Sequence, residues 1–449
     1  MKRLRPIVIV AGLVIATPAL ADSALPPWTD AGDVPMPSDA RSVVPTRDES
    51  AIYAEPGKLE ARRGSALPGT RFPLYATRRA PGCLGRWLNV GPLAWMCSDV
   101  AEYSNEDTFA PALGTRPWAL GDVDFLRPAR PGAAKLPPIE PVSGTDDGLP
   151  YRYYFAGRDG AYGYANLQNA EDESPDQDLE QGFAVAILEE RIARGERWGR
   201  TKKGRWVAMR ELVPARPNLF HGELVEGPLD IAWVNTEKAS VFATEKFEKP
   251  TAMRVRFEKI HIAEEKGNAL RLVDGGWMRA RDIARARPTP PPPEAAASER
   301  WIDVDLNQQV LTAYEGEKPV FATLVSSGLG TPLAGRGPRA KNSEFVTHTG
   351  TFRIWVKIFT TKMDNLDKDD VERHYAIEDV PWVQFFDKAI ALHGAFWHRE
   401  FGHVHSHGCV NMAPLDARWL FAFTSPHLPA GWSAALPTRM EQGTIVRVR

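Results

Sequence analysis

The sequence predicts a mainly β protein, in which several small β units precede a larger and mostly β C-terminal domain. Short runs rich in aromatic and branched residues, such as "TRFPLYAT" and "GRWLNV", alternate with Gly- and Pro-containing turns. The Pro-rich segment "ARPTPPPPEAAASE" then separates this region from a domain that opens with alternating apolar and polar residues. At about 100–200 residues per domain, the 449 residues can hold several such units.

The N-terminus has the features of an export signal. Basic "MKRLRP" precedes the apolar run Ile7 to Ala16, and "ALA" at 19–21 is a small-x-small cleavage site. The apolar run is shorter than the roughly 20 residues that a spanning helix needs, although an uncleaved membrane anchor is an alternative. We expect residues 1–21 to be a signal peptide, residues 22–48 to be a flexible leader, and the mature protein to reside in the periplasm or cell envelope.

Export changes the interpretation of the three cysteines. Paired cysteines in an oxidising compartment usually form disulfides. Cys83 and Cys97 lie close in sequence, which favours a disulfide between them and leaves Cys409 as a spare thiol. The alternative is that all three are buried and reduced.

Three segments close with a similar pattern: a Trp on a strand, then an acidic residue followed by Val, Leu or Ile. The patterns are "WLNVGPLAWMCSDV", "GRWVAMREL" and "GGWMRARDI". These segments resemble bacterial SH3-like β-barrels, modules that often accompany cell-wall enzymes. We expect SH3-like domains at 49–104, 151–216 and 228–287, a Pro/Gly-rich connector at 105–150 and a Pro-rich linker at 288–299.

The C-terminal domain, 300–449, is predicted to be mostly β with short helices. Ile302, Val304 and Leu306 alternate with polar residues, which predicts a half-buried strand followed by a turn at "EGEK" and a second strand. "GTFRIWVKIF" predicts a further strand. Short helices are expected around "DKDDVERHY" and "PLDARWLFAF", the latter with Asp416 in its first turn.

The segment "HVHSHGCVNM", from His403 to Met412, contains several candidate metal-binding or catalytic side chains. Its three histidines and Cys409 fall at every second position, a spacing that places them on one face of a strand. Same-face neighbours on a strand are about 7 Å apart, too far for four ligands to converge on one metal ion. A spare thiol with a histidine base is therefore the better hypothesis. His407 would face away from Cys409 on a strand, so His393, in a separate apolar run, is the candidate base.

"HG" at 393–394 and "SHGCVN" at 406–411 resemble the signature of the L,D-transpeptidase (YkuD-type) catalytic domain. The resemblance covers about 300–449 and includes the opening hairpin and "TGTF". It implies that Cys409 is the nucleophile, that His393 is the general base and later acid, and that the Gly394 carbonyl orients the imidazole. It further implies roles for the residues of the signature loop, His407 and Gly408 in the pocket and oxyanion region, and Ser406 and Asn411 as loop supports.

The family reaction implied by this resemblance is acyl transfer on peptidoglycan stem peptides with no metal or organic cofactor. D-Ala is released and an amine accepts the acyl group, giving a 3→3 cross-link. Water as acceptor would make the protein an L,D-carboxypeptidase, and a protein lysine would make it a wall-anchoring transferase. A wall-binding scaffold and a periplasmic metal-binding protein are the non-enzyme alternatives. Glycan or protein partners are conceivable for the SH3-like units, whereas a net charge of -2 without a basic stripe does not suggest nucleic acid.

Overall fold

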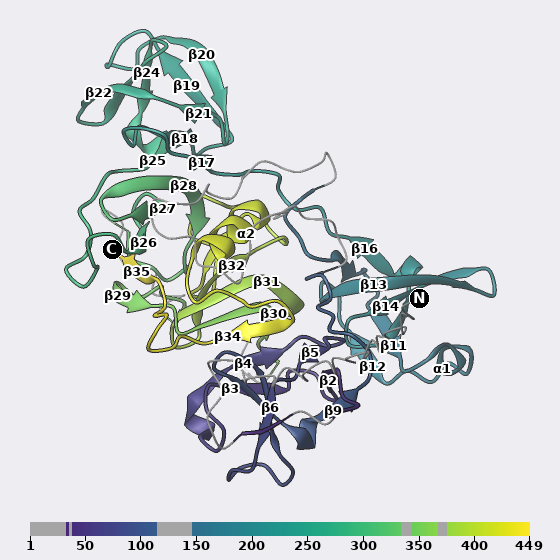
Figure 1. Ribbon diagram of the computed structural model, residues 1–449. Helices are drawn as coiled ribbons and strands as arrows, with labels where there is room; N and C mark the ends of the chain where they lie inside the picture. The colour runs from purple at the N-terminus through teal and green to yellow at the C-terminus, as the bar shows by residue number, and fades with distance from the viewer. Residues whose placement is uncertain (1–32, 36–37, 115–145, 334–343, 367–374) are drawn as a thin grey trace, which may run out of the picture.

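The computed structural model describes residues 33–35, 38–114, 146–333, 344–366 and 375–449. The expected signal peptide (1–21), the first part of the leader and most of the connector lie outside these residues, as does the helix expected around "DKDDVERHY". None of the helices in the described part of the chain has the length and apolar character needed to cross a membrane. Figure 1 shows a central C-terminal domain, coloured green to yellow, with three β units around it.

The first unit contains nine short strands and two 3₁₀ turns. They are β1 (Val34–Pro35), β2 (Ser42–Pro45), β3 (Ala51–Tyr53), a turn at Leu59–Ala61, β4 (Arg62–Ala66), β5 (Phe72–Pro73), β6 (Ala76–Arg78), β7 (Trp87–Gly91), β8 (Ala94–Cys97), a turn at Ser98–Val100 and β9 (Ala101–Ser104). Cys83 and Cys97 form a disulfide with Cα atoms 5.6 Å apart, and Cys409 is a free cysteine.

The predicted start of this unit at residue 49 is wrong, because part of the expected leader belongs to its fold. Strand β2 pairs with both β5 and β9, and Val43 is fully buried in the core. The Pro and Ser content of the segment indicated flexibility, but Ala40, Ser42 and Val43 are buried and β2 pairs with two strands.

The second unit runs from β10 to β16. Its elements are β10 (Arg152–Ala156), β11 (Ala161–Tyr164), α1 (Leu167–Glu171), β12 (Gln177–Leu179), β13 (Ala184–Ala193), β14 (Glu196–Thr201), β15 (Trp206–Ala208), a 3₁₀ turn at Met209–Glu211 and β16 (Leu212–Pro214). A short strand, β17 (Glu223–Leu224), follows it and pairs with the C-terminal domain.

The third unit lies at the top of Figure 1. Its elements are β18 (Ala232–Val234), β19 (Lys238–Phe242), β20 (Pro250–Val255), β21 (Lys259–Ile260), β22 (Ile262–Lys266), β23 (Ala269–Leu272), β24 (Trp277–Arg279), a 3₁₀ turn at Ala280–Asp282 and β25 (Ile283–Arg285).

The repeat found in the sequence corresponds to a repeated local structure. In each unit a strand with a buried tryptophan (Trp95, Trp206 or Trp277) leads into a three-residue 3₁₀ turn and then the last strand. The assignment of these units as SH3-like stays a prediction.

In the described residues of the C-terminal domain, strands surround one helix, α2. Its elements are β26 (Arg300–Asp305), β27 (Val310–Glu315), β28 (Lys318–Ser326), β29 (Gly350–Arg353), β30 (Val356–Asp364), β31 (Ala376–Asp387), β32 (Ile390–Gly394), β33 (Val410–Met412), α2 (Pro414–Phe423), β34 (Trp432–Ala435) and β35 (Ile445–Val448). All ten residues of α2 are buried, which explains why its sequence is apolar on nearly every side.

The first strand of this domain is buried on both faces, not on one as its alternating pattern predicted. Asp303 and Asp305 are almost inaccessible to solvent. Strand β35 pairs with β26 in parallel and brings two arginines beside these carboxylates, with Arg447 Nε 2.8 Å from Asp303 Oδ1 and Arg449 Nη1 3.1 Å from Asp305 Oδ2. The polar positions of the pattern therefore mark buried ion pairs rather than a solvent face.

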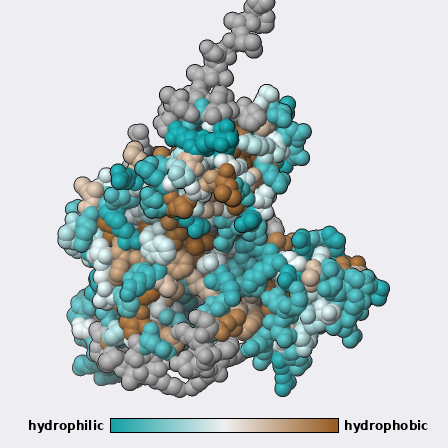
Figure 2. Space-filling view, turned by 90° about the horizontal axis from the view of Figure 1, so that it is seen from below, coloured by the Kyte–Doolittle hydropathy of each residue, from teal (hydrophilic) through white to brown (hydrophobic). Residues whose placement is uncertain are grey.

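The first unit joins the C-terminal domain through a shared sheet. Strand β34 pairs with β30 on one side and with β4 on the other. Gly64 of β4 permits this approach, because a Cβ atom there would lie 2.1 Å from the carbonyl oxygen of Ala434. The face of the molecule seen from below, in Figure 2, mixes hydrophobic with hydrophilic side chains.

The connector predicted at 105–150 ends inside the core. Leu149 is buried, and Trp382 Nε1 donates to the carbonyl of Gly148 at 2.8 Å. Asp146 forms a buried double ion pair with Arg418 of α2, in which both N···O distances are 2.8 Å. The Pro and Gly content of this stretch indicated a loose linker. Its last residues instead make buried contacts with the C-terminal domain, including the ion pair of Asp146 with α2.

Candidate active site

Strand pairing brings His393 and Cys409 to one pocket. Strands β32 and β33 are parallel, and His393 lies opposite Asn411. Cys409 immediately precedes β33, at the end of the loop that leads into this strand. All three line one cavity of about 520 Å³. The structure thus places the predicted nucleophile and the predicted base in the same pocket.

The imidazole of His393 is held in a defined tautomer. Its Nδ1 donates to the Gly394 carbonyl oxygen at 3.1 Å, so Nε2 is the nitrogen that can accept a proton. The ring is almost completely buried and stacks on Trp397, with ring centroids 5.7 Å apart. Burial lowers the pKa of His393 to about 4, against the opposing effect of the Gly394 hydrogen bond. The base is therefore neutral at physiological pH and ready to accept a proton.

The thiol of Cys409 is also neutral in the resting protein. Burial raises its pKa to about 11, although a hydrogen bond from the Ala391 backbone works in the opposite direction. The sulfur also lies 3.8 Å from the carbonyl oxygen of Ala389. Burial thus disfavours the charged form of both side chains, the imidazolium of His393 and the thiolate of Cys409.

The raised pKa predicts the pH dependence of Cys409 alkylation. We expect the rate with iodoacetamide to rise about tenfold for each pH unit from 7 to 10, because only the thiolate reacts. A thiol with the ordinary pKa of about 8.5 would level off near pH 9. Mass spectrometry of the Cys409 peptide over this range gives the profile, with N-acetylcysteine as the control. A plateau reached by pH 8 would show that a thiolate–imidazolium pair exists in the resting protein.

The loop before Cys409 is fixed by side-chain oxygens. Ser406 Oγ donates to the carbonyl of Cys409 and accepts from the Gly408 amide at 3.1 Å. Buried Thr347 Oγ1 donates to the carbonyl of Gly408 at 2.7 Å. Gly408 has a φ of +125°, a conformation that side-chain-bearing residues rarely adopt. Because the Gly408 amide is already engaged by Ser406, Gly408 shapes the loop around the nucleophile.

The stretch from His403 to Cys409 is not a strand, and the expectation that its alternate residues share one face is wrong. Strand β33 begins only at Val410, and the glycines at 402 and 408 bend the chain through positive φ angles. His403 Nε2 lies 2.8 Å from the carbonyl oxygen of Asn235 in the third unit. His405 faces His398 at 4.3 Å between ring centroids.

His407 takes a third direction. It lies at the exposed edge of the pocket, stacked on Tyr375 with centroids 5.1 Å apart and in edge contact with Phe345. The evenly spaced histidines therefore diverge to three different neighbours.

Sequence reasoning missed His398, which determines the orientation of Asn411. The Glu400 amide donates to His398 Nδ1 at 3.1 Å, so the ring proton sits on Nε2. That nitrogen is 2.9 Å from the Asn411 carboxamide and must donate to its oxygen. The amide nitrogen then occupies the other terminal position, which has no hydrogen-bond partner among the described residues. Asn411 lines the pocket, and His398 holds its carboxamide in place there. The sequence signal was present in "ALHGAFWH", whose second histidine is His398.

Comparison with known proteins agrees with this geometry. Residues 299–448 match the family model described as the L,D-transpeptidase catalytic domain. No match was found among curated proteins.

Among solved structures, the chain is similar to the catalytic domain of the Enterococcus faecium L,D-transpeptidase, with 23% identity over 34% of this chain and 100% of that chain, and a TM-score of 0.24. It is also similar to an L,D-transpeptidase from Xylanimonas cellulosilytica, with 21% identity over 36% of this chain and 65% of that one, and a TM-score of 0.23. L,D-transpeptidase 3 from Mycobacterium tuberculosis is 16% identical over 33% of this chain and 60% of that one, with a TM-score of 0.25. The chain thus spans less than two thirds of the length of the last two. On the family match, residues 299–448 form an L,D-transpeptidase catalytic domain of the YkuD family.

Proposed function

We propose that this protein is a cell-wall cysteine acyltransferase that cross-links peptidoglycan stem peptides. The observation that carries the proposal is the shared pocket of His393 and Cys409, in which the tautomer of His393 leaves Nε2 to accept the thiol proton. Cys409 has no disulfide partner in the structure, as a nucleophile requires. The family match of residues 299–448 supports the same reaction class.

The first half-reaction forms a thioester. His393 Nε2 takes the proton of the Cys409 thiol as the sulfur attacks the carbonyl of the third stem residue. We assign the developing oxyanion to the Cys409 amide, since the Gly408 amide already donates to Ser406. The protonated imidazole then gives its proton to the amine of D-Ala, which leaves.

The second half-reaction transfers the acyl group to an amine. The side-chain amine of a second stem attacks the thioester, neutral His393 removes a proton from the amine, and the Cys409 thiol is regenerated. The product is a 3→3 cross-link. Water in place of the amine would give a tripeptide, the product of an L,D-carboxypeptidase. The expected signal peptide at 1–21 would direct this activity to the cell envelope. Glycan or protein partners of the β units stay predictions.

The test is a product analysis with the disaccharide-tetrapeptide as the sole substrate. We expect the full chain to release D-Ala and to form 3→3 dimers, and we expect Cys409→Ser to form neither. The dimer-to-tripeptide ratio identifies the acceptor, and an excess of tripeptide would make the enzyme a carboxypeptidase. Equal D-Ala release by wild type and Cys409→Ser would exclude the thiol mechanism.

A further inference from the structure

The catalytic pocket is built by two parts of the chain, not by the C-terminal domain alone. Phe155 of β10, together with Gln181 and Gly182 from the turn between β12 and β13, lines the same cavity as His393 and Cys409. We propose that the second β unit is the substrate-binding wall of this site, and that Phe155 and Gln181 contact the stem peptide. This inference rests on the proposed function and adds a specificity role for a unit outside the residues that match the family.

The wall is attached to the C-terminal domain by one buried hydrogen bond and two partly exposed ion pairs. Tyr153 of β10 is buried, and its hydroxyl donates to the carbonyl of Asp379 at 2.6 Å. Lys202 Nζ lies 2.6 Å from Asp379 Oδ1, and Lys203 Nζ lies 2.6 Å from Glu378 Oε1. These contacts attach the unit at two places, β10 and the turn between β14 and β15, to β31, the strand that carries Glu378 and Asp379.

Strand β13 adds a backbone contact close to the pocket. Ala184 of β13 bridges to Ile377 of β31 in a parallel arrangement, and Ile377 itself lines the cavity. The turn that carries Gln181 immediately precedes β13. The position of Gln181 relative to the catalytic domain is therefore set by sheet pairing three residues further along the chain, at Ala184.

A row of rings connects the second unit to the catalytic base. The ring of Tyr153 lies 4.2 Å from that of Phe396, and Phe155 contacts the same ring at 5.9 Å. Phe396 then contacts Trp397 at 5.2 Å, and Trp397 stacks on His393. The unit thus packs directly against the segment that follows His393, and this packing places Phe155 in the wall of the cavity that His393 and Cys409 also line.

The chemistry of the wall fits the uncharged part of a peptide. Phe155, Met363 and Ile377 offer apolar surface, and Gln181 supplies a carboxamide with both donor and acceptor atoms. Lys, Arg, Asp and Glu are absent from the described residues that line this cavity. A carboxylate pressed against such a surface would lose hydration without gaining a counter-charge. Peptide bonds and alanyl methyl groups of the stem match the carboxamide and the apolar side chains.

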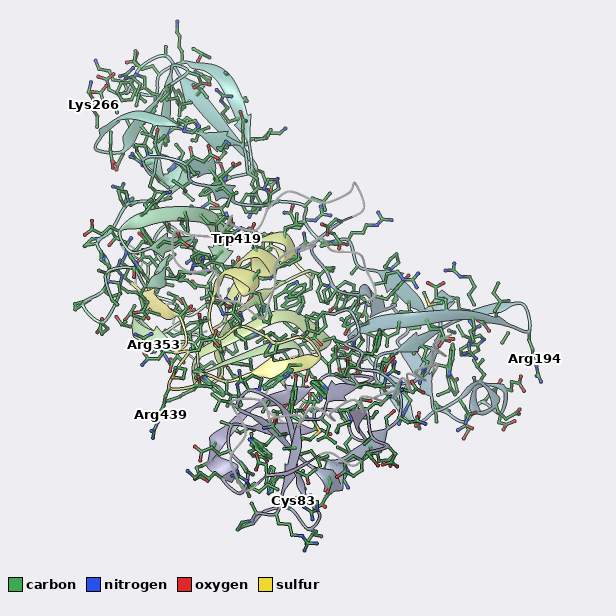
Figure 3. The ribbon with its side chains drawn as sticks, in the orientation of Figure 1. Cys83, Arg194, Lys266, Arg353, Trp419 and Arg439 are labelled. Atoms are coloured by element: carbon green, nitrogen blue, oxygen red, sulfur yellow. A yellow bond between two sulfur atoms is a disulfide. The ribbon has the colours of Figure 1, made fainter. Side chains whose placement is uncertain are left out.

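The test measures binding separately from chemistry. The full chain with Cys409→Ser is titrated with the disaccharide-tetrapeptide, and the Kd is compared with that of the same protein carrying Gln181→Ala or Phe155→Ala. We expect each added change to raise the Kd about 10-fold, the effect of losing one good contact. Ile192→Ala is the matched control, because Ile192 is exposed in the β13–β14 hairpin, whose outer tip is marked by Arg194 in Figure 3. It should leave the Kd unchanged.

A second readout excludes indirect damage to the site. With Cys409 present, Gln181→Ala and Phe155→Ala should be alkylated by iodoacetamide at the wild-type rate, since the small reagent needs no wall. Gln181 is exposed on a turn, so its replacement keeps the test valid if Phe155→Ala fails to fold. The inference is overturned if the Kd is unchanged in Gln181→Ala and in any folded Phe155→Ala protein. It is also overturned if a variant that binds more weakly is alkylated more slowly at Cys409, because the substitution would then have damaged the catalytic site itself. Failure of the proposed function itself would appear elsewhere, as absence of D-Ala release by the wild type.

Discussion

His393→Gln is expected to lower the rate of D-Ala release from the disaccharide-tetrapeptide by about 10²–10⁴-fold, the usual contribution of a positioned general base. The effect follows from the resting state of the site. Burial raises the pKa of the Cys409 thiol to about 11, so almost no thiolate exists at neutral pH without a base. Glutamine retains a polar side chain but cannot accept and return a proton. Rapid-quench measurement of D-Ala in a single turnover gives the rate.

Two comparisons show whether the slower release of D-Ala results from the loss of His393 as a base. His403→Gln is the matched control, because His403 contacts Asn235 of the third unit, and glutamine can make the same hydrogen bond. It should react at the wild-type rate. At pH 11, iodoacetamide should alkylate Cys409 in His393→Gln as it does in the wild type, since hydroxide then removes the proton. A His393→Gln protein that keeps more than a tenth of the wild-type rate would show that another group activates the thiol.

Arg418→Met is expected to cost about 3–5 kcal/mol of stability, the effect of leaving one partner of a buried ion pair uncompensated. Arg418 and Asp146 are each about 5% exposed or less at their side chains, and they make two parallel contacts of 2.8 Å. Methionine fills much of the volume of arginine but leaves the Asp146 carboxylate buried against α2. Urea unfolding, followed by tryptophan fluorescence, measures the shift of the transition that includes the C-terminal domain.

A surface ion pair supplies the comparison for this variant. Arg41 and Asp107 are 3.3 Å apart but 65% and 85% exposed, so Arg41→Met should change stability by about 0–1 kcal/mol. Adding Asp146→Asn to Arg418→Met removes the stranded charge and should recover part of the loss. Equal stability of Arg418→Met and Arg41→Met would mean that water reaches Asp146. The ion pair between the connector and α2 would then contribute little to the free energy of unfolding.

The two candidate reacting groups could be predicted from sequence. The expected export, together with one expected cysteine pair, singled out Cys409, and the resemblance to the L,D-transpeptidase signature implied that His393 is its base. The parallel pairing of β32 with β33, which begins one residue after Cys409, brings these two residues, sixteen positions apart, to one pocket. The strand expected at 403–409 is absent: Gly402 just before it and Gly408 within it have positive φ angles, and hydropathy spacing carries no information about backbone dihedral angles.

The remaining features of the site depend on tertiary contacts that no local pattern encodes. Phe155 and Gln181 lie more than two hundred positions before Cys409, and the docking of the second unit brings them into its pocket. His398 acts through a hydrogen bond to Asn411, whose direction depends on a backbone amide at Glu400. Asp303 followed the pattern of a solvent-facing strand, but pairing of β26 with the C-terminal strand buried it beside two arginines.

The claim that Cys409 is the nucleophile of acyl transfer is tested most directly by the intact mass of the protein. The full chain is mixed with disaccharide-tetrapeptide and quenched in acid at short times, and the adduct is located by peptide mapping. The account predicts a mass increase equal to the donor minus D-Ala, carried by the peptide that contains Cys409 and absent from Cys409→Ser. Release of D-Ala with no adduct on that peptide, or with the adduct on another residue, would contradict it.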